Sequence, residues 1–109
     1  DNTTRRVILE AKRYIQENYQ NPDLSVEMIC RELHMSPAYF STVFKRETGQ
    51  TYIAYLTDVR LSKAVELLGE TDDKTYVIAQ KVGYQEQNYF SYVFKKRFGV
   101  SPTKFRSAQ

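Results

Sequence analysis

The sequence predicts an all-α protein of seven helices, in which two helix-turn-helix units are joined by a long linking helix. The first observation behind this prediction is a seven-residue phrase that occurs twice, as YFSTVFK at 39–45 and as YFSYVFK at 89–95. The second is that apolar residues recur at three- and four-residue spacing, which is the period of an amphipathic helix. One internal duplication in 109 residues indicates two related units that share a task.

The duplication extends well beyond the phrase. Downstream the two copies keep an offset of fifty residues, so that Tyr55 matches Phe105. Upstream the offset falls to forty-nine, so that Ile29 matches Ile78, and the second copy therefore carries one extra residue just before its phrase. Residues that build the fold should agree between copies, whereas residues that contact a variable partner are free to differ. The one mismatch within the phrase falls on its fourth letter, Thr42 in one copy and Tyr92 in the other.

Three helices are expected in the first half. Residues 4–19 form an amphipathic pattern that ends before Pro22, and residues 26–33 form a short helix after Ser25, a favoured N-cap residue. A hydroxyl cap followed by proline at Ser36-Pro37 starts a helix that runs over 37–48 and ends at a glycine. The residues of this third helix that we expect in the core are Tyr39, Phe40, Val43 and Phe44. The matched residues of the second phrase, Tyr89, Phe90 and Phe94, are expected in the core as well.

Four helices are expected in the second half. Residues 51–68 form the linking helix, capped by Thr51 and ended by Gly69. A short helix over 75–82 has Asp73 as its expected cap, and a helix over 86–98 carries the second phrase with a poorer cap. Ser101-Pro102 starts a final short helix. The apolar stripe of the linking helix is expected at Ile53, Leu56, Arg60, Leu61, Ala64, Leu67 and Leu68.

This pattern predicts a division into a first subdomain over 4–50, a linking helix over 51–69 and a second subdomain over 70–109. The 41% hydrophobic and 27% charged residues are typical of a soluble globular protein. No apolar run approaches the ~20 residues that span a bilayer, so no membrane association is expected. The sequence begins at Asp1 without a methionine, so we expect a fragment of a longer protein or a processed or trimmed chain.

Single titratable residues exclude several kinds of site. Cys30 is the only cysteine, which excludes an internal disulfide and favours the reducing cytoplasm. His34 is the only histidine, and one such ligand cannot hold a metal, so neither a metal nor another cofactor is expected. There are no paired carboxylates, no Ser/His or Cys/His set and no glycine-rich phosphate loop, so the sequence does not predict an enzyme.

Charge is unevenly distributed, although the formal net charge is only +3. No acidic residue occurs between Gln87 and Gln109, a segment that indicates a polyanionic partner such as nucleic acid. Solvated helix ends are the alternative interpretation, because basic residues favour helix C-termini. The basic residues of the segment are Lys95, Lys96, Arg97, Lys104 and Arg106.

In helix-turn-helix proteins the second helix enters the DNA major groove and its exposed N-terminal half meets base edges. A helical protein-interaction module is the alternative function, and it predicts apolar patches on the two phrase helices. Those helices instead expose Ser, Thr, Gln, Asn, Lys and Arg, which favours DNA. The candidates for phosphate contact are Ser36, Lys45, Arg46, Lys95, Lys96, Ser101 and Lys104. Six such contacts would give a log–log salt slope of about −5.

The chain resembles the DNA-binding domain of AraC/XylS-type regulators. The resemblance rests on LSVEMICRELHMSPAYFSTVFKRETG, YLTDVRLSKAVELL and IAQKVGYQEQNYFSYVFKKRFGVSPTKFR, and it extends from about Ala11 to Arg106. It implies seven helices, sequence-specific binding to double-stranded promoter or operator DNA, and transcription regulation. It also implies a regulatory domain outside this fragment, which senses a ligand or carries a phospho-acceptor receiver as in two-component response regulators. RNA polymerase is a further expected partner.

By position in the family motif, the base-reading residues fall on Ala38, Ser41, Thr42, Gln87, Asn88, Ser91 and Tyr92. Many members of the family carry arginine at the positions of Thr42 and Tyr92, where it pairs with guanine, and this chain departs from that pattern. Threonine offers a methyl group that suits thymine, and the amides of Gln87 and Asn88 suit adenine. We therefore expect more A·T readout than in a relative that carries arginine.

Overall fold

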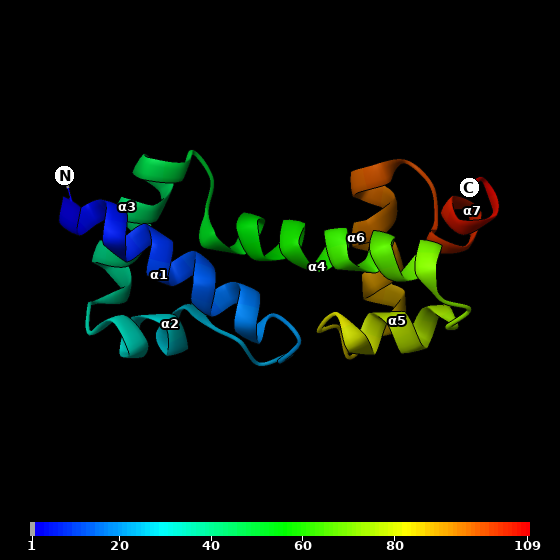
Figure 1. The fold of residues 1–109 in the computed structure, drawn as a ribbon, viewed down its shortest axis with the longest axis horizontal. Helices are drawn as coiled ribbons and strands as arrows, with labels where there is room; N and C mark the ends of the chain where they lie inside the picture. Colours follow the sequence, from blue (N-terminus) through cyan, green and yellow to red (C-terminus); the bar gives the residue numbers. More distant parts are fainter. Residues whose placement is uncertain (1) are drawn as a thin grey trace. The chain divides into compact units, whose positions relative to one another are not determined.

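The computed structural model describes residues 2–109 and folds them into helices alone, which confirms the predicted fold (Figure 1). None of the helices in this range is both long and apolar enough to cross a bilayer. The helices are α1 (Asn2–Asn18), α2 (Val26–Leu33), α3 (Pro37–Thr48), α4 (Tyr52–Glu70), α5 (Thr75–Lys81), α6 (Gln87–Phe98) and α7 (Pro102–Ser107).

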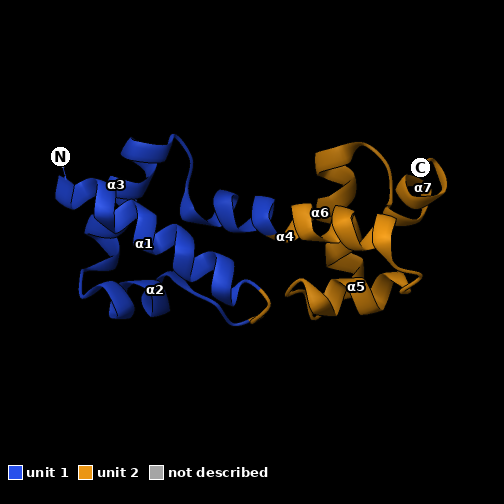
Figure 2. Cartoon of the chain, in the orientation of Figure 1, with its two compact units in different colours: residues 1–19, 23–59 blue, residues 20–22, 60–109 orange. Residues whose placement is uncertain are grey.

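The chain forms two compact units, each with its own core (Figure 2). Unit 1 comprises residues 1–19 and 23–59, and unit 2 comprises residues 20–22 and 60–109. Helix α4 belongs to both, because its first half contributes to the core of unit 1 and its second half to that of unit 2. The division at 51–69 into a separate linking element stays a prediction.

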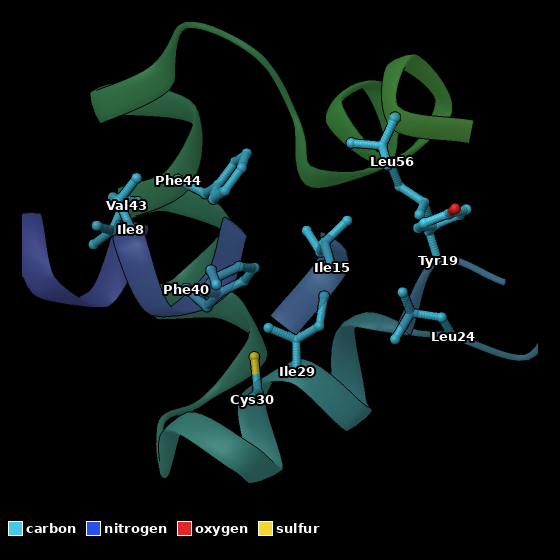
Figure 3. Packing of buried hydrophobic residues seen from close by; sticks show 12 residues of the cluster. Ile8, Ile15, Tyr19, Leu24, Ile29, Cys30, Phe40, Val43, Phe44 and Leu56 are labelled. Carbon is cyan, nitrogen blue, oxygen red and sulfur yellow. The ribbon is translucent and has the colours of Figure 1, made fainter. Parts of the chain in front are cut away.

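Unit 1 is organised around two phenylalanines of α3 (Figure 3). Phe40 and Phe44 are fully buried, and their ring centroids lie 5.5 Å apart. They lie in one cluster with Ile15 of α1 and Ile29 of α2, while Tyr55 of α4 meets the ring of Phe44 edge-on at 5.8 Å. Burial of a phenylalanine side chain contributes about 1.5–3 kcal/mol, so this pair fixes how α3 lies on its unit.

Unit 2 repeats this packing with the matched residues of the second copy. Phe90 and Phe94 of α6 are fully buried with centroids 5.8 Å apart, and Phe105 of α7 meets Phe94 edge-on at 5.4 Å. Phe105 stands fifty residues after Tyr55, so the repeat seen in the sequence continues in the tertiary contacts. Helix α7 is therefore the counterpart in unit 2 of the start of α4 in unit 1.

The turns before the phrase helices explain the change of offset. His34 and Gly83 stand forty-nine residues apart and both have positive φ, 57° and 104°. The N-caps of α3 and α6, Ser36 and Glu86, stand fifty apart. The extra residue of the second copy therefore lies between the positive-φ position and the N-cap. Gly83 adopts this backbone without strain, whereas a side chain with a Cβ is disfavoured there.

Hydroxyl caps start four of the helices as predicted. The Oγ of Ser25 caps α2 by accepting a hydrogen bond from the backbone N–H of Met28 at 3.3 Å. The Oγ of Ser36 accepts a hydrogen bond from the backbone N–H of Tyr39 at 3.2 Å, and Ser101 and Thr51 cap α7 and α4 in the same way. Helix α6 differs, because the side chain of its N-cap Glu86 makes no capping hydrogen bond although its backbone is extended as a cap requires (φ −107°, ψ 115°).

Several expectations about helix boundaries and the core were wrong. Asp73 does not cap α5, whose N-cap is Lys74; instead the Asp73 carboxylate accepts a hydrogen bond from Lys81 Nζ at 2.6 Å. Gly69 does not end α4, which continues to Glu70. Ile53 is 59% exposed, because the buried side of α4 runs through Tyr52, Leu56 and Val59 and Ile53 lies off this line. The two helices flanking Gly83 are also each one residue shorter than predicted, ending at Lys81 and beginning at Gln87.

Two arginines of unit 2, Arg60 and Arg106, donate hydrogen bonds to backbone carbonyls of the same unit. Arg60, which is only 8% exposed, donates from Nη2 to the carbonyl of Asn21 at 2.9 Å and lies over the ring of Tyr84 at 5.4 Å. Desolvation by burial lowers the pKa of Arg60. Arg106 of α7 donates to three backbone carbonyls at the end of α4 and in the loop that follows, those of Leu68 (3.1 Å), Asp73 (2.6 Å) and Thr71 (3.0 Å).

Because one guanidinium group satisfies three carbonyls, Arg106→Met should be costly. We expect the free energy of unfolding to fall by about 2–4 kcal/mol, since charged hydrogen bonds are lost and carbonyls are left without a partner. Urea denaturation followed by circular dichroism measures the change. Lys104→Met removes a neighbouring exposed cation from the same helix and should cost less than about 0.5 kcal/mol. Equal losses for the two variants would contradict the assigned role of Arg106.

The missing side-chain cap of α6 predicts a stabilising substitution. Glu86→Asp keeps the charge and shortens the side chain to one that caps well, so the free energy of unfolding should rise by about 0.5–1 kcal/mol. Ser36→Ala is the reverse test at the matched position of α3 and should lower it by about 1 kcal/mol. Thermal and urea unfolding both report the change. If Glu86→Asp gives no gain while Ser36→Ala gives the expected loss, the N-terminus of α6 is not limited by its cap.

Candidate nucleic-acid interface

The outer face of α3 is set by its buried side. With Phe40 and Phe44 in the core, residues about half a turn away point outward, and the structure exposes Ala38, Ser41 and Thr42. The hydroxyl of Thr42 donates to the carbonyl of Ala38 at 3.1 Å. The hydrogen of this hydroxyl is therefore already used within the helix, so that Thr42 offers an incoming group its methyl and an acceptor oxygen.

The outer face of α6 presents a different surface. Gln87 and Asn88 are exposed in its first turn, and Ser91 is half-buried. Tyr92, at the place of Thr42, is 61% exposed, and Lys96 Nζ lies 6.0 Å from the centre of its ring. Amides, a hydroxyl and an aromatic ring thus follow one another along this face, whereas the matched face of α3 carries only small side chains.

Two tyrosines that the sequence placed in the core lie at the surface. Tyr39 and Tyr89 are each 58% exposed, so the core prediction was wrong for both. Each stands one residue before the first buried phenylalanine, about 100° round the helix and at the edge of the buried arc. Tyr89 packs between two other tyrosines, Tyr84 at 5.9 Å and Tyr92 at 6.5 Å between centroids. Both copies carry a tyrosine at this position, and its phenolic hydroxyl, which favours contact with water, could have indicated a place at the boundary between core and surface.

The basic candidates for phosphate contact are all exposed, but their local surroundings differ. In unit 1, Lys45 Nζ donates to the carbonyl of Gly49 at 3.2 Å, and Arg46 Nε pairs with the carboxylate of Glu47 at 2.9 Å. In unit 2, Lys95 and Lys96 occupy the matched positions with no acidic residue after them in the chain. The remaining exposed candidate cation is Lys104 of α7.

Ser36 and Ser101, the other two candidates, are N-caps whose hydroxyls already accept a backbone hydrogen bond. Ser36 is exposed and Ser101 is half-buried. Each hydroxyl retains its hydrogen as a donor, which is the group that a phosphate oxygen requires. Contact of these two serines with phosphate stays a prediction.

The remaining titratable groups form no alternative centre. Cys30 is buried, and desolvation together with the charge of Glu27 raises the pKa of its thiol, which disfavours the reactive thiolate. His34 is exposed in the turn before α3. Across residues 2–109 no three His, Cys, Asp or Glu side chains are grouped so that they could hold a metal ion.

Known proteins are similar to this chain in sequence and in fold. A helix-turn-helix domain family matches residues 29–108. The arabinose operon regulatory protein of Escherichia coli is 32% identical over 100 residues, which cover 92% of this chain and 34% of that protein. The chain spans about a third of the length of the curated relatives that it matches first.

Two solved structures are similar to this chain in fold. The C-terminal domain of AraT, a response regulator from Geobacillus stearothermophilus, is 41% identical with a TM-score of 0.92 and covers 94% of this chain and 85% of its own. The DNA-binding domain of AdpA, solved in complex with a target DNA, is 24% identical with a TM-score of 0.87 and covers 93% and 90%; that likeness concerns the fold. By its matched residues, its helix-turn-helix units and these relatives, the chain belongs to the AraC-type helix-turn-helix family.

Proposed function

We propose that this chain binds double-stranded DNA sequence-specifically to regulate transcription, with α3 and α6 as its two recognition helices. The observation that carries the proposal is that each helix buries its own pair of phenylalanines at matched positions and leaves a polar, hydrogen-bonding face outside. A helix held in this way fits the major groove, where base edges present distinct sets of donors and acceptors. Family membership supports the same assignment, because the relatives are regulators of transcription.

The two faces are proposed to read different half-sites. In unit 1, Ala38, Ser41 and Thr42 offer small groups, and the back-bonded Thr42 presents its methyl to a thymine methyl. In unit 2, Gln87 and Asn88 have the amide geometry that reads adenine. The ring of Tyr92, with Ser91 beside it, presents an apolar edge to thymine methyls or a hydroxyl to phosphate.

Phosphate contacts are proposed to set the register of the chain on the duplex, since such contacts position a protein without reading sequence. The exposed lysines and Arg46 at the C-terminal ends of α3 and α6 and on α7 supply the charge, and the capping hydroxyls of Ser36 and Ser101 add neutral donors. Tyr39 and Tyr89, which border the outer faces, extend the contact surface beyond the residues predicted from the sequence.

The wider role of the protein follows from its family. We propose that a regulatory domain lies outside these residues, that the bound complex acts on RNA polymerase, and that the protein works in the cytoplasm. No catalytic role is proposed, because the one cysteine is buried with a raised thiol pKa and the exposed polar residues of α3 and α6 are suited to hydrogen bonding rather than to nucleophilic attack.

Selection of bound duplexes from a random pool tests the function and the half-site assignment together. The chain should enrich a bipartite site with A·T-rich contacts, and Tyr92→Ala should relax preference in one half only. Tyr92→Phe, which keeps the ring and removes the hydroxyl, should retain the preference if the ring edge reads thymine. Failure to enrich any sequence would favour a protein-interaction module. Enrichment of half-sites made only of G·C pairs, or equal loss at every position for Tyr92→Ala, would overturn the base-reading assignment.

A further inference from the structure

The two compact units carry opposite charge. Unit 1 contains seven Lys and Arg residues and eight Asp and Glu residues, a formal charge of −1. Unit 2 contains nine Lys and Arg residues and five Asp and Glu residues, a formal charge of +4. The modest net charge of the chain therefore hides a strong difference between two units that are otherwise built alike.

Contacts within unit 1 occupy several of its basic side chains. Arg46, at the end of α3, is paired with Glu47 at 2.9 Å. Lys45 is turned back onto the C-terminal carbonyl of Gly49, where the helix dipole is negative. On α1, Arg13 bridges Glu10 at 2.6 Å and Glu17 at 3.0 Å. Unit 1 thus offers a phosphate backbone little uncompensated charge beside its recognition helix.

In unit 2 most acidic residues lie away from the recognition helix along the chain; the exception is Glu86, the N-cap of α6, at the opposite end of that helix from its basic residues. Four of its five acidic residues lie between Glu66 and Asp73, at the end of α4 and in the loop that follows. Helices α6 and α7, which pack against each other, contain no acidic residue at all. Lys96 lies over the ring of Tyr92, a contact that orients the ammonium group without cancelling its charge. The exposed face of this helix pair is therefore strongly basic.

We propose that the α6–α7 face of unit 2 is the electrostatic anchor of the chain on duplex DNA, whereas unit 1 adds sequence reading with little salt-dependent affinity. This inference rests on the proposed function. Neutralised phosphates release counterions, so the unit with more uncompensated charge carries most of the non-specific affinity and of the salt dependence. Unit 2 then holds the chain on any sequence while unit 1 discriminates.

The repeat supplies a matched pair of variants. Lys95→Gln with Lys96→Gln removes two charges from the last turn of α6, and Lys45→Gln with Arg46→Gln removes two from the matched turn of α3. The affinity of the 109-residue chain for a random-sequence duplex is measured by fluorescence anisotropy over a series of KCl concentrations. The magnitude of the negative log–log salt slope should decrease by about 2 for the α6 variant, at about 0.9 per lost phosphate contact. For the α3 variant the decrease should be less than half of that.

Circular dichroism and thermal unfolding confirm that both variants remain folded, as expected for exposed side chains. Equal reductions of the slope, or a larger one for the α3 variant, would overturn the inference while leaving DNA binding in place. If the unaltered chain binds no duplex at any salt concentration, the proposed function fails and the inference fails with it. A steep salt slope that is reduced only in the α6 variant supports both the proposed function and the inference.

Discussion

Everything else in this protein depends on the burial of two phenylalanines one turn apart in each recognition helix. Phe40 with Phe44, and Phe90 with Phe94, are fully shielded from water, and each pair closes a core built from its own unit. Because burial of both rings leaves a helix one rotational setting, it also determines which residues face outward. The packing of the core therefore determines the outer faces of α3 and α6.

This constraint explains why much of the fold could be predicted from the sequence. The phrase helices, the hydroxyl caps at Ser36 and Ser101 and the matched partners Tyr55 and Phe105 are local or repeated signals. The errors concern positions where tertiary contacts decide. Tyr39 and Tyr89 sit at the edge of the buried arc, where spacing alone does not separate core from surface. Asp73 pairs with Lys81, eight residues away, rather than capping its nearest helix.

The distribution of available positive charge on the surface could be predicted least well, because a count of basic residues does not show which partner each side chain binds. Arg60 and Arg106 belong to the basic half of the chain, yet both are bound to backbone carbonyls inside unit 2. Arg46 is compensated by Glu47, whereas Lys96, at the matched position, lies over an aromatic ring. Two units with the same core have therefore diverged in their surfaces.

The central claim is that the outward faces of α3 and α6 are the surfaces that meet DNA. Titration of the ¹⁵N-labelled chain with its selected duplex, followed by NMR, tests this claim most directly. The account predicts that the largest amide shift changes occur along α3 and α6, around Thr42 and Tyr92, with small changes along α1 and α5. Shift changes centred on α1 or α5, with α3 and α6 unaffected, would contradict it.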